Sequence, residues 1–121
     1  MTSSRHPFLD DLAPDAVLTS TAMRKPLKGR EAITRVIKAG GTLYERMEPM
    51  FHARYGDKSF VEYDAVLKDG PALHVVSVVH WNEKEEVVRV NVSFSPLHGA
   101  LSFASKMSHL LAGSDEREYF L

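Results

Sequence analysis

Cysteine is absent from this sequence, which excludes disulfides, thiolate nucleophiles and cysteine-ligated zinc. No charge of one sign dominates, because 16 acidic and 15 basic residues are interspersed along the chain. A basic face that could neutralise a row of phosphates is therefore lacking. No apolar run reaches the length of a membrane span, and Met1–Pro7 has no apolar stretch of signal-peptide length. We expect a cytoplasmic protein that binds neither nucleic acid nor membrane.

Residues that break helices and strands are also few, with 7 glycines and 6 prolines in 121 residues. This length suits one domain with one hydrophobic core. We expect the core over about residues 8–112 and a C-terminal tail over residues 113–121. A separate cofactor-binding module does not fit in such a chain, so we expect no cofactor and no metal ion.

Four stretches rich in β-branched and aromatic residues form the clearest pattern that is present. They are Glu48–Tyr55, Ser59–Leu67, Ala72–Trp81 and Glu85–Phe94. The turn residues Gly56-Asp57, Asp69-Gly70 and Glu83-Lys84 separate them. Short turns between successive strands predict an antiparallel meander.

Two segments outside the meander have the periodicity of helices. Gly29–Ala39 turns Ile33, Val36 and Ile37 to one side, and Gly40-Gly41 ends it. A second helix is predicted from Pro96 to Leu111, and a short strand over Ala16–Ser20. An apolar helix side must be matched by an apolar sheet surface. We therefore predict an α+β cone: a curved antiparallel sheet, made of the meander and short N-terminal strands, packed on a helix and followed by a C-terminal helix.

Turns of two residues would fix the pairing of the strands and assign each side chain to a face. The face predicted to lie under the helix carries Phe51, Ala53, Tyr55, Phe60, Val66, Leu73, Val75, Val79, Trp81, Val88, Val90, Val92 and Phe94, with Glu62, Asp64 and Ser77 as polar exceptions. The outer face carries Met50, His52, Arg54, Val61, Tyr63, His74, Val76, Val78, His80, Arg89, Asn91 and Ser93. A three-residue turn at Lys68-Asp69-Gly70 would instead move Glu62 and Asp64 outward.

Candidate site residues follow from this assignment. Asp64 and Glu62 stand two apart on one strand, hence on one face, and burial would raise the pKa of at least one of them. Such a carboxyl can act as a general acid or base. The alternative is that both acids are solvated or paired with Lys58 or Arg54. The residues predicted to bind a ligand are Tyr44, Phe60, Ser77, Trp81, Val90 and Phe94.

The outer face mixes apolar and polar groups, which suits a two-fold contact between copies of the chain. We expect a homodimer through His52, Tyr63, His74, His80, Arg89 and Asn91. A shared metal site for His74 and His80 is excluded, because six residues along a strand span about 20 Å.

The order of elements, the helix start Lys28-Gly29-Arg30-Glu31-Ala32-Ile33 and the exit Ser95-Pro96-Leu97 resemble the nuclear transport factor 2-like superfamily, particularly its SnoaL-like branch. The resemblance spans about residues 8–111. It implies a cone-shaped fold and includes ketosteroid isomerases, polyketide cyclases, epoxide hydrolases and proteins that only bind or assemble. The resemblance implies that the two carboxylic acids of the isomerase branch would fall near Ser20 and Ser77 of this chain, so steroid isomerisation is disfavoured.

Three functions stay open on this evidence. The first is a small-molecule-binding protein whose pocket is mainly apolar and takes an apolar or aromatic molecule. The second is a cofactor-independent acid/base enzyme of the cyclase or hydrolase kind, acting on an aromatic or polyketide-like substrate. The third is a non-enzymatic dimeric interaction module whose cone is filled by Trp81 and Phe94.

Overall fold

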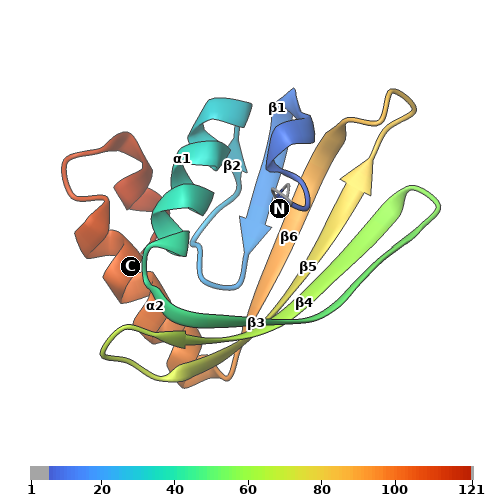
Figure 1. Ribbon diagram of the computed structural model, residues 1–121. Helices are drawn as coiled ribbons and strands as arrows, with labels where there is room; N and C mark the ends of the chain where they lie inside the picture. Colours follow the sequence, from blue (N-terminus) through green and yellow to red (C-terminus); the bar gives the residue numbers. More distant parts are fainter. Residues whose placement is uncertain (1–5, 121) are drawn as a thin grey trace, which may run out of the picture.

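The computed structural model describes residues 6–120; most of the N-terminal leader, residues 1–5, and the last residue of the predicted tail, Leu121, lie outside the described residues. Six strands, two α-helices and two 3-10 helices follow one another in this part of the chain (Figure 1). They are η1 Leu9–Asp11, β1 Leu12–Ser20, β2 Leu27–Lys28, α1 Arg30–Gly41, β3 Tyr44–Tyr55, β4 Lys58–Leu67, β5 Ala72–Trp81, β6 Val87–Ser95, α2 Leu97–Leu110 and η2 Asp115–Tyr119.

The strands form one curved sheet in the order β2-β1-β6-β5-β4-β3. The predicted meander β3 to β6 is confirmed, and all of its neighbouring strands are antiparallel. The prediction of a wholly antiparallel sheet is wrong, because β1 pairs with β6 in parallel. The two strands are far apart in sequence, so no hairpin turn sets their relative direction. The α+β cone itself is confirmed.

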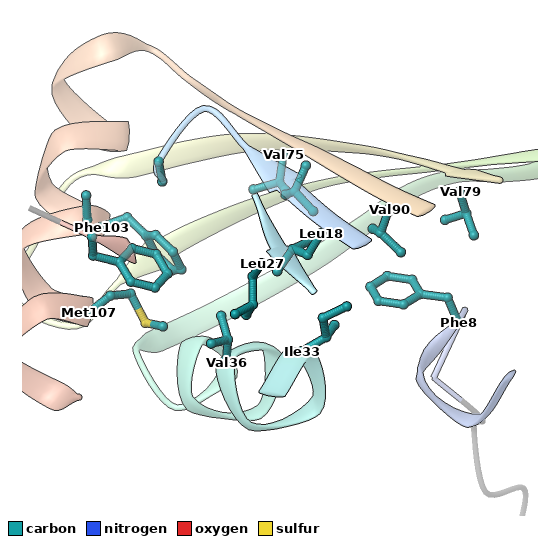
Figure 2. Close-up of a cluster of buried hydrophobic side chains, with 14 of the residues drawn as sticks. Phe8, Leu18, Leu27, Ile33, Val36, Val75, Val79, Val90, Phe103 and Met107 are labelled. Carbon is teal, nitrogen blue, oxygen red and sulfur yellow. The ribbon is translucent and has the colours of Figure 1, made fainter. Parts of the chain in front are cut away.

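Helix α1 packs its apolar side onto the sheet, as its periodicity predicts. It begins after Gly29, whose φ of 112° favours glycine, and it carries Glu31 in its first turn. Ile33 and Val36 are buried. Together with side chains of β1, β5 and β6 they form one hydrophobic core (Figure 2). Both helices lie on the same side of the curved sheet (Figure 1).

The pairing of β4 with β5 differs from the predicted one by a single residue. Val66 pairs with Ala72, and residues 68–71 connect the two strands. The predicted two-residue turn would have paired Lys68 with Pro71, but Pro71 has no N–H to donate to such a pair. Because side chains alternate along a strand, this shift moves every β4 side chain to the opposite face. The inward residues of β4 are therefore Ser59, Val61, Tyr63, Ala65 and Leu67, which pair with or flank buried positions of β5.

Strand β3 pairs with β4, so the faces predicted for its side chains change together with those of β4. His52 pairs with Val61 and shares the inner face. A register shift lies between Pro49 and Phe51, as expected for a β-bulge. Tyr55, predicted to lie inside, is 85% exposed. β3 thus forms an open edge of the sheet with exposed apolar side chains.

Candidate functional site

A cavity of about 760 Å³ lies between the inner face of the sheet and the helices. Its lining comes from the N-terminal segment, β1, α1, β3 to β6, α2 and the C-terminal end of the chain. On the β3 side the lining residues Met47, Met50 and Phe51 are about half exposed, at 50%, 54% and 54%. This side is therefore the mouth of the cavity. Its size matches the usual range for small-molecule sites.

Two tyrosines place their hydroxyl groups together in the cavity wall. Tyr44 begins β3, directly after α1, and Tyr63 lies on the inner face of β4 because it pairs with buried Val75. Their hydroxyl oxygens are 3.4 Å apart. Burial raises the pKa of both phenols, because the charged form loses its hydration. Phenols are neutral near pH 7 even in water, and burial makes their ionisation less favourable still. Their hydroxyl groups can donate hydrogen bonds to a ligand oxygen.

A row of aromatic rings continues from this pair. The rings of Tyr44 and Phe103 lie 6.0 Å apart with a 20° angle between their planes, and Phe103 stacks on Phe94 at 4.5 Å. All three residues line the cavity. A flat apolar molecule would thus find aromatic surface beside the paired hydroxyls.

The two serines singled out by the resemblance both line the cavity. Ser77 on β5 is 4% exposed and pairs with Val61 and Val92. The hydroxyl of Ser20 accepts a hydrogen bond from the backbone N–H of Ala22 at 3.0 Å. Both sites carry an uncharged hydroxyl where the isomerase resemblance implies an acid. The structure therefore places no carboxyl group at either position.

The predicted ligand-binding residues fall into two groups. Tyr44, Ser77 and Phe94 line the cavity. Three others do not line it: Phe60 lies on the outer face, contrary to the prediction, Val90 is fully buried in the core on the predicted face, and Trp81 lies outside the lining. Phe60 moved with the register of β4. The ligand-binding roles themselves stay predictions.

Trp81 packs beyond the cavity for a local reason. Its indole N–H donates to the hydroxyl of buried Ser59 at 3.0 Å. The guanidinium of Arg54 lies over the face of the ring, 4.6 Å from its centroid. The indole is thus held between a hydrogen bond and a cation–π contact, so it does not fill the cone.

Glu62 is among the residues that line the cavity and Asp64 is not, but the carboxyl groups of both are bound to His74 on the other face, contrary to our prediction. They lie on the outer face with His74, whose Nε2 is 2.8 Å from Glu62 Oε2 and whose Nδ1 is 2.8 Å from Asp64 Oδ1. The backbone pairing places Asp64 directly opposite His74. Neither carboxyl is buried, since the side chains are 34% and 50% exposed. The geometric basis for Asp64 and Glu62 as a buried acid/base pair is lost.

His74 is held between two anions, which gives a pH prediction. The hydrogen bond to Asp64 raises the pKa of His74 above its usual 6.5, and Glu62 adds to the effect. The folded state thus binds this proton more tightly than the unfolded state does. The resulting stabilisation is complete below about pH 6.5 and is lost as the pH rises through the higher folded value.

We expect an NMR titration of the His74 ring to give a pKa above 6.5. Asp64→Asn should lower this value more than Glu62→Gln does, because the Asp64 hydrogen bond is the larger cause. The two variants serve as controls for each other, since each removes one anion from the same ring. If the pKa of His74 were the same in Asp64→Asn as in the unmodified protein, the hydrogen bond between His74 and Asp64 would be contradicted.

The surface predicted for dimerisation is only partly on the outside. His52 and Tyr63 face inward and line the cavity, so their place in that surface is wrong. The other four members do occupy the outer face: His74, His80, Arg89 and Asn91. The error has the same cause as before, the register of β4. A dimer through this face stays a prediction.

Several lining residues were missed by the sequence analysis. The alternative three-residue turn at Lys68-Asp69-Gly70 predicts that Tyr63 and His52 lie on the inner face. Phe103 and Phe120 had no such signal, because they reach the cavity through contacts between distant segments. Within residues 6–120, no group of three or more His, Asp or Glu side chains has an arrangement that could hold a metal ion. In the same part of the chain, no helix is both long and apolar enough to cross a membrane.

Comparison with known proteins reveals similarity in structure and not in sequence. No family model matches the chain, and no curated protein matches it. A steroid delta-isomerase from Pseudomonas aeruginosa is similar over 86% of this chain and 77% of its own, with a TM-score of 0.79 and 21% identity. An uncharacterised protein with a cystatin-like fold from Silicibacter pomeroyi is similar over 90% and 76%, with a TM-score of 0.81 and 16% identity.

A nuclear transport factor 2-like protein of unknown function from Mesorhizobium loti is similar over 74% of this chain and 75% of its own, with a TM-score of 0.64 and 16% identity. Structures described as SnoaL-like and ketosteroid isomerase-like share the same architecture. At such identities the similarity establishes the fold alone. The fold implied by the sequence resemblance is confirmed.

Proposed function

We propose that this chain, which has the nuclear transport factor 2-like fold, binds one small, mainly apolar or aromatic molecule that carries a hydrogen-bond-accepting oxygen. The observation that carries the proposal is the pair of neutral tyrosine hydroxyls, Tyr44 and Tyr63, in the wall of a cavity of about 760 Å³. Apolar lining supplies most of the affinity in such sites, and a few polar groups fix the orientation of the ligand.

Isomerase-type turnover is disfavoured by two of the residues that line the cavity. The steroid isomerase among the structural relatives is an enzyme, but this chain has Ser20 and Ser77 at the positions where the resemblance implies acids. A serine hydroxyl does not abstract a proton from carbon near neutral pH without a partner base. A cyclase- or hydrolase-like activity would need a different proton acceptor from the Asp64 and Glu62 pair.

The test uses prodan, a fluorescent naphthyl ketone that is neutral and has one carbonyl acceptor. We expect it to bind with a blue-shifted emission and to lose at least about tenfold in affinity in Val61→Trp, since the indole would occupy the cavity. Val78→Trp is the matched control, because Val78 is half-buried on the opposite face of the sheet. Equal binding to both variants would refute the cavity as the site.

The companion variant Tyr63→Phe keeps the ring and removes one hydroxyl. A single hydrogen bond contributes about 0.5–1.5 kcal/mol, so prodan binding should weaken roughly 2–12-fold. Unchanged affinity would restrict the proposal to an apolar pocket without an oxygen anchor.

The outer face of the sheet supports a second proposal, a homodimer. It combines the half-buried Val76 and Val78 with His80 and Arg89. Such a mixed surface suits a contact between two copies. This dimer and a cytoplasmic location are proposals.

A further inference from the structure

The C-terminal end of the chain forms a strap, defined here as residues 114–120, that crosses from the end of α2 towards α1. Gly113, with a φ of 88°, reverses the chain after α2. The strap contains η2 and has two buried side chains: Glu116 is 5% exposed and Phe120 is 3% exposed. From the sequence alone, this region is predicted to be a C-terminal tail.

Polar contacts hold the strap against the body. Arg35 on α1 donates two hydrogen bonds to the Glu116 carboxylate, at 3.1 and 2.9 Å. This contact lowers the pKa of Glu116, so the pair is charged at neutral pH. Lys25 lies 3.3 Å from Glu118 and 4.7 Å from the centre of the Tyr119 ring.

The strap is also joined to the turn that follows β1. The backbone N–H of Arg24 donates to the carbonyl of Tyr119 at 2.8 Å. This bond joins the residues next to Met23 and Phe120, and both of these side chains line the cavity. Among the described strap residues, Phe120 alone reaches the lining.

Phe120 differs from the other walls in how it is supported. Sheet side chains such as Ser77 and Val92 are fixed by the ladders of neighbouring strands. Phe120 follows a 3-10 helix of five residues, and charged groups at the surface provide much of its attachment. Arg35 is 58% exposed, so water competes for this ion pair and it is weaker than a fully buried one.

We propose that Phe120 is the residue that limits the size of the bound ligand, and that Glu116 acts through it as a positioning residue. The inference depends on the proposed binding function. A docked strap keeps the phenyl ring in the cavity and admits a compact ligand. Removal or displacement of the ring extends the cavity towards α1 and the turn after β1, and a longer ligand then fits.

The test compares two naphthyl ketones that differ only in the acyl chain, the propionyl compound prodan and its octanoyl homologue. The wild-type protein should prefer the propionyl probe. In Phe120→Ala the affinity ratio should shift by at least about tenfold towards the octanoyl probe. Phe60→Ala is the matched control, because it removes the same ring from the outer face and should leave the ratio unchanged. Phe120→Leu keeps an apolar side chain and should give a smaller shift in the same direction. It provides the test if Phe120→Ala does not fold.

Glu116→Gln tests the positioning role. It should shift the same ratio towards the octanoyl probe by about threefold or more, although the residue does not line the cavity. A merely structural defect would lower the affinity for both probes equally and leave their ratio unchanged. The charge-reversed double variant Arg35→Glu/Glu116→Arg should restore the wild-type ratio.

The outcomes separate the two proposals. If prodan binds and Val61→Trp abolishes binding, but Phe120→Ala and Phe120→Leu leave the ratio unchanged, the size limit set by Phe120 is refuted and the proposed function stands. If neither probe binds the wild-type protein, both proposals fall together.

Discussion

Replacing Ile33 by alanine is expected to lower the free energy of unfolding by about 3–4 kcal/mol. Ile33 is fully buried at the contact between α1 and the sheet, near Leu18 and Val90 (Figure 2). Removing its branched side chain leaves a cavity lined by atoms that β1 and β6 hold in place, so the space cannot close fully. The better helix propensity of alanine offsets only a few tenths of a kcal/mol. Urea denaturation followed by circular dichroism measures the loss.

The neighbouring Thr34 provides the control. Thr34→Ala removes a hydroxyl that bonds back to the Arg30 carbonyl on the exposed side of the helix, and it should change the stability by no more than about 0.5 kcal/mol. If Ile33→Ala cost less than about 1 kcal/mol, α1 would not be packed on the sheet as described. The cavity beneath it would then lose one of its walls.

The elements of this fold could be predicted because their signals are local. Ile33, Val36 and Ile37 repeat at helical spacing, and Gly40-Gly41 stops the pattern. The structure ends α1 at Gly41, within a few residues of the predicted end. The four meander strands were likewise bounded by turn residues. Each of these signals needs only a short window of sequence.

The faces of the sheet could not be fixed in the same way. They depend on the length of one connection, the one before β5, where Pro71 excludes the tightest pairing. A one-residue difference reversed Phe60, Glu62 and Asp64 together, since the side-chain period of a strand is two. The same shift brought Tyr63 into the cavity. The alternation on β4 itself favours the observed face, because Val61, Tyr63, Ala65 and Leu67 lie on it, whereas the opposite face carries two acids among its four residues. The assumed length of the turn outweighed this local signal.

The cavity itself depends on contacts between distant segments. Gly40 on α1 allows Phe103 of α2 to approach closely, since a Cβ at Gly40 would lie 3.1 Å from the ring. Phe120 enters through the strap, which Arg35 holds across 81 residues of sequence. Such contacts leave no periodic trace in the chain, so no sequence pattern could have predicted which aromatic residues meet.

Replacing Ser77 by aspartate should destabilise the protein strongly and in a pH-dependent way. Ser77 is 4% exposed and faces the cavity between Val61 and Val92. A carboxylate there loses most of its hydration, so its folded-state pKa should rise by about 2–3 units above the unfolded value near 3.9. This shift corresponds to about 3–4 kcal/mol. The loss is absent below about pH 3.9, grows as the pH rises to the folded pKa, and is constant above it.

Urea denaturation at pH 4 and pH 7.5 would measure this difference. Ser77→Asn is the matched control, because it has the same shape without a titrating group and should cost the same amount of stability at both pH values. Ser93→Asp, on the exposed outer face of β6, should change little at either pH. An equal loss for Ser77→Asp at both pH values would mean that water fully hydrates position 77. The cavity would then be hydrated at this depth, and the ligand proposed for it would lose its apolar site.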